Sequence, residues 1–254
     1  MLVINQIQVL TDNYVYIITE STSKITACVD PSVYDDVVNF LDNNDLKLDY
    51  ILNTHHHNDH VGGNLKLKEK YGCKIIGSFN DQERVPGIDI KLKENDYFSI
   101  GRSIFKIIDT PGHTNGHICF YFEEDQVLFS GDTIFSLGCG RLFEGSYEAM
   151  TSSLLKIKSL PSKTKIYCGH EYTQANAKFA LFLNSEDKNL KKKVDDINKK
   201  RAKSIPTVPF LLEEELKFNP FLKFNESTYL NSIGIEDLDE VKNFEKIRVL
   251  KDNF

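Results

Sequence analysis

The segment Thr54-His55-His56-His57-Asn58-Asp59-His60 follows a short apolar run at positions 50–52 and leads into Val61-Gly62-Gly63. Residues two apart in an extended chain point the same way, so His55 and His57 can converge on one ion. Asp59 and His60 follow at an expected turn into a helix and can reach a second point nearby. Three imidazoles and a carboxylate in six residues have little structural use without a metal, although a polar surface loop is the competing interpretation. The segment therefore predicts a metal site.

Three later segments each place a possible ligand beside a glycine at the end of an apolar run. They are Pro111-Gly112-His113, Ser130-Gly131-Asp132 and Cys168-Gly169-His170. Glycine lets the backbone bend sharply at such points. A single His or Asp at a strand end is more often a hydrogen-bonded turn residue, but the three together with the first segment indicate one shared site.

The pattern of apolar residues predicts strands in two batches with helices between them. The first batch covers residues 2–9, 14–19, 24–30 and 50–52, and the second covers 73–76, 97–100, 103–109, 117–122, 126–130 and 165–168. Helical patterns follow Pro31, with Val33, Val37, Phe40 and Leu41 on one face, and lie near residues 64–71 and 147–159. Two batches of strands with intervening helices favour an α/β sandwich of two sheets covered by helices.

The pattern changes after His170, because helical periodicity dominates from Tyr172 onward. Residues 186–203 predict a helix with Leu190, Val194 and Ile197 as its apolar stripe, and Ser185 is the expected N-cap. We therefore expect two domains, 1–171 and 172–254.

Composition excludes several classes of protein. The chain has 254 residues, 41% hydrophobic and 27% charged, with a formal net charge of −6. A nucleic-acid-binding protein would normally have a basic surplus, and no apolar run is long enough to span a bilayer. The first 19 residues alternate like a strand and lack the basic start of a signal peptide. The five scattered cysteines form no CxxC pair, which indicates reduced thiols in a cytoplasmic protein.

The spacing HxHxDH, followed by a His, an Asp and a final His, resembles the metallo-β-lactamase superfamily. The resemblance implies an αββα sandwich holding two divalent metal ions, zinc first and iron or manganese as alternatives. By this resemblance His55, His57 and His113 bind one ion, Asp59, His60 and His170 bind the other, and Asp132 bridges them. Asp59 and Asp132 are the expected catalytic residues. His56, His117 and Cys168 are then left with structural or supporting roles.

A narrower resemblance lies outside these ligands. The segments Asp12-Asn13-Tyr14, Gly138-Cys139-Gly140-Arg141-Leu142-Phe143-Glu144-Gly145, Cys168-Gly169-His170-Glu171-Tyr172-Thr173, Phe218-Asn219-Pro220-Phe221 and Arg248-Val249-Leu250-Lys251-Asp252-Asn253-Phe254 resemble glyoxalase II, the hydroxyacylglutathione hydrolase family. That family has a helical C-terminal domain that closes over glutathione. The resemblance implies substrate contacts from Arg141, Phe143, Tyr172, Arg248 and Lys251. Phe143 departs from the family, in which tyrosine is common at this position, so a hydroxyl contact is absent there.

The implied reaction is hydrolysis of an S-(2-hydroxyacyl)glutathione, typically S-D-lactoylglutathione, to glutathione and a 2-hydroxy acid such as D-lactate. Hydroxide generated at the metals would be the nucleophile, and the step would be the second in methylglyoxal detoxification. The expected partner is this small thioester alone, bound by a monomer. The alternatives are a glutathione persulfide dioxygenase with a single iron, another binuclear hydrolase of the superfamily, and a non-catalytic metal-binding module.

Overall fold

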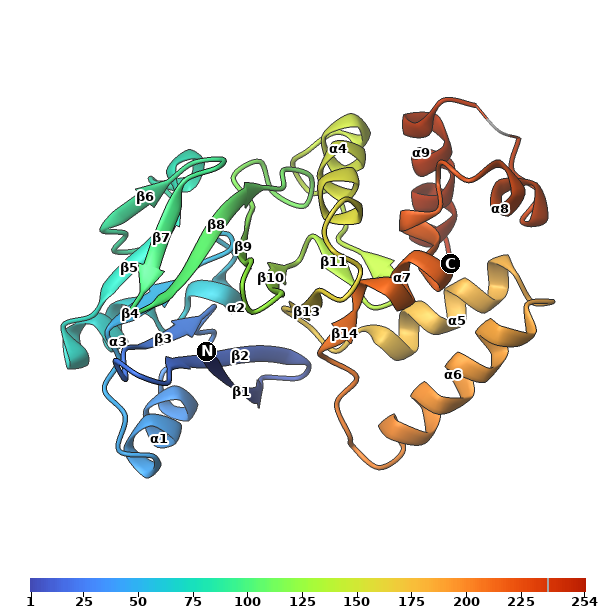
Figure 1. Ribbon diagram of the computed structural model, residues 1–254. Helices are drawn as coiled ribbons and strands as arrows, with labels where there is room; N and C mark the ends of the chain where they lie inside the picture. The colour runs from blue at the N-terminus through green and yellow to red at the C-terminus, as the bar shows by residue number, and fades with distance from the viewer. Residues whose placement is uncertain (237) are drawn as a thin grey trace.

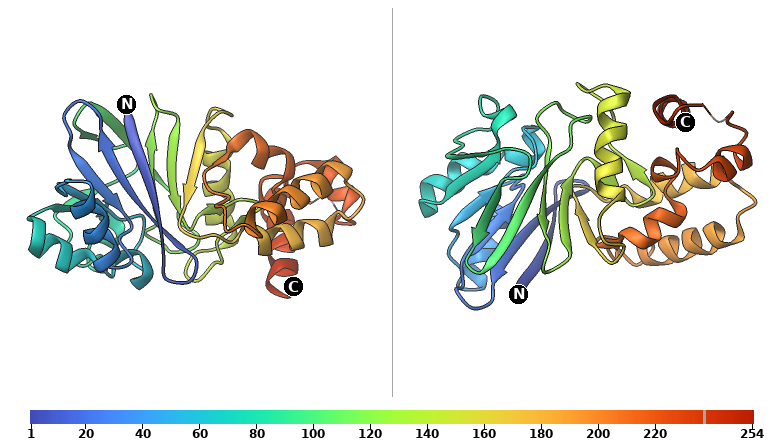
Figure 2. Two further views of the ribbon diagram at one scale, coloured as in Figure 1. Left: turned by 90° about the horizontal axis from the view of Figure 1, so that it is seen from below. Right: turned by 45° about the horizontal axis from the view of Figure 1, so that its top comes forward.

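Two six-stranded sheets pack against each other in the computed structural model, which describes residues 1–236 and 238–254 (Figures 1 and 2). The first sheet runs in chain order and is antiparallel in its first three strands, then parallel. Its strands are β1 (Leu2–Val9), β2 (Asn13–Glu20), β3 (Thr26–Val29), β4 (Tyr50–Leu52), β5 (Lys74–Ser78) and β6 (Ile90–Leu92).

The second sheet has the order β14-β13-β10-β9-β8-β7. Its strands are β7 (Tyr97–Ile100), β8 (Ser103–Asp109), β9 (Ile118–Phe122), β10 (Val127–Gly131), β13 (Lys165–Cys168) and β14 (Phe210–Leu211). A small separate hairpin is formed by β11 (Ile134–Phe135) and β12 (Gly138–Cys139). The pair β10–β13 is parallel, so both of these strands deliver their C-terminal ends to the same edge.

Alternation along β2 explains why the first sheet is buried on both faces. Tyr14, Tyr16 and Ile18 belong to the hydrophobic cluster between the sheets. Val15 and Ile17 belong to a second cluster on the opposite face. Because successive strand residues point to opposite faces, one continuous apolar run supplies both layers.

Helices cover the outer faces of the sandwich. Val37 and Leu41 of α1 (Asp35–Asn43) and Leu67 of α3 (Asn64–Tyr71) complete the outer cluster of the first sheet. Helix α4 (Tyr147–Lys158), capped by the Ser146 side chain, buries Met150, Leu154 and Ile157 in the main hydrophobic cluster, which includes residues from both faces of the second sheet. The structure thus confirms the predicted layered α/β architecture.

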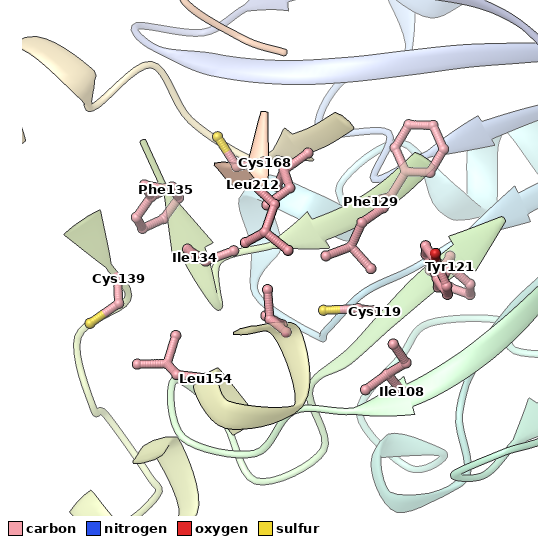
Figure 3. Packing of buried hydrophobic residues seen from close by; sticks show 14 of the residues in the cluster. Ile108, Cys119, Tyr121, Phe129, Ile134, Phe135, Cys139, Leu154, Cys168 and Leu212 are labelled. Atoms are coloured by element: carbon pink, nitrogen blue, oxygen red, sulfur yellow. The ribbon is translucent and has the colours of Figure 1, made fainter. Parts of the chain in front are cut away.

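The main core continues beyond the sheets into the C-terminal part of the chain. Figure 3 shows Phe129 of β10, Leu154 of α4 and Leu212 around the β11–β12 hairpin residues Ile134 and Phe135. These side chains are all buried. The hairpin is therefore fixed between the sandwich and the helices that follow it.

The chain after β13 is mainly helical and forms a C-terminal helical domain (Figure 1). Its helices are α5 (Thr173–Leu183), α6 (Lys188–Arg201), α7 (Leu212–Phe218), α8 (Ser227–Ser232) and α9 (Glu240–Asp252), with a 3₁₀ turn, η2 (Pro220–Leu222). None of the helices in residues 1–236 and 238–254 is both long and apolar enough to cross a membrane.

The predicted apolar stripe of α6 is confirmed, because Leu190, Val194 and Ile197 are buried. The predicted N-cap Ser185 is wrong. Asp187 caps the helix instead, and its side chain accepts hydrogen bonds from the backbone amides of Asn189 and Leu190. An aspartate two residues closer to the apolar stripe can reach the free amides that Ser185 cannot.

Candidate metal centre

The seven predicted ligand residues converge where strand ends of the two sheets meet. His55 and His57 follow β4, and Asp59 and His60 lie on the short helix α2 (Asn58–Val61). His113, Asp132 and His170 follow β8, β10 and β13, respectively. The structure therefore brings together residues that are separated by up to 115 positions in sequence.

His55, His57 and His113 form the first cluster. The Nδ1 atom of His57 lies 3.1 Å from Nε2 of His55 and 3.1 Å from Nε2 of His113. Nitrogens bound to one tetrahedral zinc at about 2.0–2.1 Å lie roughly 3.3–3.4 Å apart. The three nitrogens thus have the spacing that one metal ion requires, and together they form a potential metal-binding group.

Asp59, His60 and His170 form the second cluster. The Nε2 atoms of His60 and His170 are 3.3 Å apart, and Oδ2 of Asp59 lies 3.4 Å from Nε2 of His170. The same oxygen lies 3.6 Å from Nε2 of His60. This second set also has the spacing of ligands around one ion.

Asp132 lies between the two clusters. Its Oδ2 is 3.5 Å from Nε2 of His113 in the first cluster and 3.3 Å from Nε2 of His170 in the second. Its Oδ1 is 3.5 Å from Nε2 of His60 and is buried, and within residues 1–236 and 238–254 it has no hydrogen-bond partner. A buried carboxylate oxygen left without a donor is costly, and a cation between the clusters would satisfy it.

The ring nitrogens on the far side of the clusters are held by hydrogen bonds. Nδ1 of His60 lies 3.0 Å from Oδ2 of Asp30, and Nδ1 of His170 lies 2.8 Å from Oδ1 of Asp12. Nδ1 of His113 donates to the carbonyl oxygen of Arg141 at 2.9 Å. Such partners fix the tautomer and orientation of ligand histidines.

The sequence reasoning missed Asp30 as a site residue. Its carboxylate accepts the backbone amide and the hydroxyl of Thr54 at 2.8 and 2.7 Å, in addition to its contact with His60. Only the tertiary pairing of β3 with β4 brings Asp30 next to Thr54. Asp12 belongs to the family segment Asp12-Asn13-Tyr14, but the sequence did not indicate that its side chain contacts His170.

Asp59 is also held in place from outside its own segment. Asn13 donates from its side-chain amide to Oδ2 of Asp59 at 3.0 Å and to its carbonyl oxygen at 3.2 Å. The Ser32 hydroxyl donates to the same carbonyl oxygen. Asp59 therefore keeps a fixed carboxylate although its side chain is 42% exposed, so it faces both the second cluster and the solvent.

The two remaining histidines have other contacts. Nε2 of His117 accepts the backbone amide of Asp132 at 3.1 Å, and its Nδ1 lies near the hydroxyls of Thr110 and Thr133. His56 turns away and places Nδ1 3.0 Å from Oδ2 of Asp81. Neither belongs to a potential metal-binding group within the described residues. Their contacts are compatible with the structural or supporting roles predicted for them.

Two glycines are needed for the clusters to close. Gly131 has φ of +46°, and a Cβ there would lie 2.3 Å from Oγ1 of Thr54. A Cβ at Gly169 would lie 2.4 Å from Oδ1 of Asp132 and 2.7 Å from the His60 ring. A side chain at position 169 would fill the space between the ligands.

The electrostatics of the clusters suit cation binding. A hydrogen bond to His170 holds the pKa of Asp59 well below its usual range. Burial raises the pKa of Asp132, but the neighbouring His170 and His60 imidazoles lower it by a larger amount, so the pKa lies below its usual range and the carboxylate stays ionised. Burial lowers the pKa of His55 well below 6.5. Burial also lowers the pKa of His60 and His170, but the Asp132 carboxylate and its neighbours raise it by more, to about 11 for His170. A metal ion would therefore find ionised carboxylates and a neutral His55, and would replace the protons of His60 and His170.

A cavity of about 420 Å³ opens over the clusters. Its walls combine metal-cluster residues with residues of the hairpin, the following loop and the helical domain: His57, Asp59, His113, Asp132, Phe135, Cys139, Gly140, Arg141, Phe143, His170, Tyr172, Ala175, Asn176, Arg248 and Lys251. All five residues expected to bind substrate, Arg141, Phe143, Tyr172, Arg248 and Lys251, therefore line one pocket with the candidate ligands.

Arg248 and Lys251 of α9 are not part of a solvated terminal segment. Arg248 is 3% exposed, donates to the carbonyl oxygen of Cys139 at 3.3 Å and pairs with Asp252 at 2.7 Å. Its Nε has no hydrogen-bond partner among the residues that the structure describes. Lys251 is half-buried and donates to the carbonyl oxygen of Ala175 at 3.4 Å. Both cations are held at the pocket wall.

Two aromatic rings lie directly on the candidate ligands. The Tyr172 ring stacks on His170 with centroids 4.6 Å apart and an interplanar angle of 4°. Phe143 is 64% exposed, and its ring lies 5.2 Å from that of His113 and 5.8 Å from that of His57. The pocket therefore combines aromatic rings that lie against the clusters with three cations, Arg141, Arg248 and Lys251, in its wall.

Comparison with protein families divides the chain into two matched segments. Residues 13–170 match the metallo-β-lactamase superfamily, and residues 171–254 match the family described as hydroxyacylglutathione hydrolase C-terminus.

Similar proteins with full-length matches include hydroxyacylglutathione hydrolases of Methylococcus capsulatus and Pelagibacter ubique. Each is 48% identical to this chain. The match to the Methylococcus protein covers 100% of this chain and 99% of that protein. The match to the Pelagibacter protein covers 98% of this chain and 98% of that protein.

Solved structures share the fold at lower identity. The BLEG-1 B3 metallo-β-lactamase has a TM-score of 0.67 and 22% identity, with 87% of this chain and 99% of that chain covered. ETHE1 from Myxococcus xanthus has a TM-score of 0.68 and 20% identity, with 97% of this chain and 96% of that chain covered.

Proposed function

This chain belongs to the hydroxyacylglutathione hydrolase family of the metallo-β-lactamase superfamily, and on that premise we propose that it hydrolyses S-(2-hydroxyacyl)glutathione at a site with two divalent metal ions. It is a metal-binding thioester hydrolase, as its full-length relatives are named. The substrate typical of this chemistry is S-D-lactoylglutathione, giving glutathione and D-lactate. The single observation that carries the proposal is the pair of three-ligand clusters with the Asp132 carboxylate between them.

In this proposal His55, His57 and His113 hold one ion, Asp59, His60 and His170 hold the other, and Asp132 touches both. Zinc is the proposed metal, with iron or manganese as alternatives, because imidazole and carboxylate ligands without thiolate suit all three. Ions held by these residues would lower the pKa of bound water and so would supply a hydroxide nucleophile near neutral pH.

The protein's own groups position the reactants. Asp59, fixed by Asn13 and partly exposed to the pocket, can accept a proton from the attacking water or orient it. The leaving group is a thiolate, whose conjugate acid has a pKa near 8.5, so no strong general acid is required. Phe143 and Tyr172 lie against ligand histidines and give the pocket an apolar surface beside the clusters.

The pocket wall has the positive charge needed for the glutathione moiety. Arg141, Arg248 and Lys251 line it, and glutathione carries two carboxylates that pair well with such cations. These contacts lie away from the thioester, so we assign them to binding rather than to the chemical step.

The competing assignment is a persulfide dioxygenase with a single iron. That enzyme needs one metal cluster, whereas a second cluster is assembled here from Asp59, His60 and His170 and is oriented by Asp12 and Asp30. The second cluster favours the hydrolase.

The test combines elemental analysis of the purified, metal-replete protein with two activity assays. We expect two metal ions per chain, hydrolysis of S-D-lactoylglutathione, and no oxygen consumption with glutathione persulfide. One ion per chain together with oxygen consumption would overturn the proposal in favour of the dioxygenase.

The remaining expectations accompany this proposal. We propose a catalytic domain at residues 1–171 and a glutathione-binding helical domain at 172–254, acting as a monomer without nucleic acid or membrane partners. We also propose a cytoplasmic location, supported by the five cysteines, which are all buried and unpaired.

A further inference from the structure

A charged network lies beside the pocket and includes none of the proposed metal ligands or substrate contacts. It consists of His56, Asp81, Arg84 and Glu144. These residues come from three separate segments: the histidine-rich segment, the turn after β5, and the loop after β12. The turn contains the 3₁₀ helix η1 (Phe79–Asp81). The network therefore joins parts of the chain that are distant in sequence.

Glu144 makes the contacts that connect these segments. Arg84 donates to it in a bidentate arrangement, with Nη1 2.5 Å from Oε1 and Nη2 3.2 Å from Oε2. The backbone amide of Asn115 donates to Oε2 at 2.8 Å, and Nε2 of His56 lies 3.6 Å from Oε1. Bidentate arginine–carboxylate pairs are the strongest and most directional ion pairs of this kind.

Arg84 is held in turn by Asp81 of η1, the turn that follows β5. Its Nε donates to Oδ1 of Asp81 at 3.0 Å, and its Nη2 contacts the same oxygen. The side chain of Asp81 is fully buried, and its second oxygen lies 3.0 Å from Nδ1 of His56. The guanidinium thus bridges a buried carboxylate to Glu144 and gives the loop a rigid attachment point.

The loop that Glu144 holds carries two pocket residues. Arg141 and Phe143 precede it by three and one positions, and both line the cavity while remaining exposed. Burial therefore does not fix these two side chains. The loop backbone is joined to the His113 turn, since Phe143 donates to the carbonyl oxygen of His113 at 3.3 Å and Gly145 donates to that of Gly112 at 3.1 Å.

We infer that Glu144, clamped by Arg84, is a positioning residue that sets the place of Arg141 and Phe143 over the pocket and thereby controls substrate affinity. The inference rests on the proposed function, because it needs Arg141 to contact the substrate. Glu144 acts through the loop and does not touch the substrate.

The test compares Glu144→Ala and Glu144→Gln with the wild-type protein in S-D-lactoylglutathione hydrolysis. A displaced loop weakens binding more than chemistry, so we expect Glu144→Ala to raise KM on the order of tenfold while kcat falls less than threefold. Glu144→Gln keeps an acceptor for the Asn115 amide, so its KM should lie between those of the wild-type protein and Glu144→Ala. Inactivity of the wild-type protein would instead refute the proposed function, which separates the two failures.

A double-mutant cycle identifies the route of the effect. In an Arg141→Ala background, Glu144→Ala should raise KM by less than threefold further, because residues that act through one contact are not additive. A full tenfold effect in that background, or an unchanged KM in Glu144→Ala alone, would overturn the inference.

Asp89→Ala is the matched control. Asp89 pairs with Lys68 at 2.6 Å and accepts one backbone amide, from Ile75 at 2.8 Å. Lys68 and Asp89 are 35% and 32% exposed, close to 37% and 25% for Arg84 and Glu144. We expect a similar change in Tm for both alanine variants and a KM change only for Glu144→Ala. Equal KM changes in the two would assign Glu144 a merely structural role.

Discussion

Replacing Asp30 with asparagine should lower metal affinity without altering the fold. Asp30 is buried and has φ of +50°, a backbone conformation that asparagine tolerates well. The asparagine carbonyl can still accept the Thr54 amide that Oδ1 accepts now at 2.8 Å. The new NH₂ group would then stand where Oδ2 receives Nδ1 of His60 at 3.0 Å.

Two donors cannot share that hydrogen bond, so Nδ1 of His60 would have to lose its proton to accept from the amide. The proton would move to Nε2, the atom that faces His170 and Asp59 in the second cluster. A protonated Nε2 cannot bind a metal. Changes to partners of this kind typically cost 10–100-fold in metal affinity, or about 1.4–2.7 kcal/mol.

Titration of the metal-free protein against a chromophoric chelator measures this affinity in two steps. We expect one of the two steps to shift by at least tenfold in Asp30→Asn, with unchanged circular dichroism. Asp49→Asn is the control, because Asp49 accepts the Thr26 amide at 2.9 Å outside the clusters. Affinities within threefold of wild type for Asp30→Asn would refute the tautomer reasoning.

Three further outcomes are expected. Asp132→Ala removes the carboxylate between the clusters, so kcat should fall by orders of magnitude in a protein that remains folded, and near wild-type turnover would contradict the bridging role. Lys251→Ala removes a contact remote from the thioester, so KM should rise roughly 10–100-fold with little change in kcat; an equal loss on a small thioester without glutathione would contradict this. Burial raises the pKa of Glu215 to about 7. The folded protein therefore binds this proton more tightly than the unfolded chain, and stability is lost as the pH rises from about 4.5 to about 7. Urea unfolding at pH 5 and pH 8 should show a decline about 2.5 kcal/mol larger in wild type than in Glu215→Gln, and parallel pH profiles would contradict it.

Much of the fold could be predicted because its long strands have a clear pattern. The predicted strands at 2–9 and 103–109 coincide with β1 and β8. The hairpin of β11 and β12 and the strand β14 were not predicted, because two-residue strands are too short to show periodicity. Their positions depend on packing between the sandwich and the helical domain.

The site residues that could be predicted are those that lie close together in sequence and form an unusual cluster of metal-binding side chains. His55, His57 and Asp59 belong to such a pattern, and the structure places them in the two clusters. Asp30 and Glu144 were not predictable, because isolated carboxylates acquire their roles only through tertiary contacts. The burial of Arg248 against Cys139 was not predictable either, because it depends on how α9 docks.

The candidate ligands are complete by His170, whereas the cations of α9 come much later in the chain. This separation has a consequence for protein synthesis. A growing chain emerges from its N-terminal end, and domains tend to fold in that order. The proposed metal ligands are thus all available before α9 has been made, whereas Arg248 and Lys251 are added nearly 80 residues later. During translation, the capacity to acquire metal would precede the capacity to discriminate among thioesters.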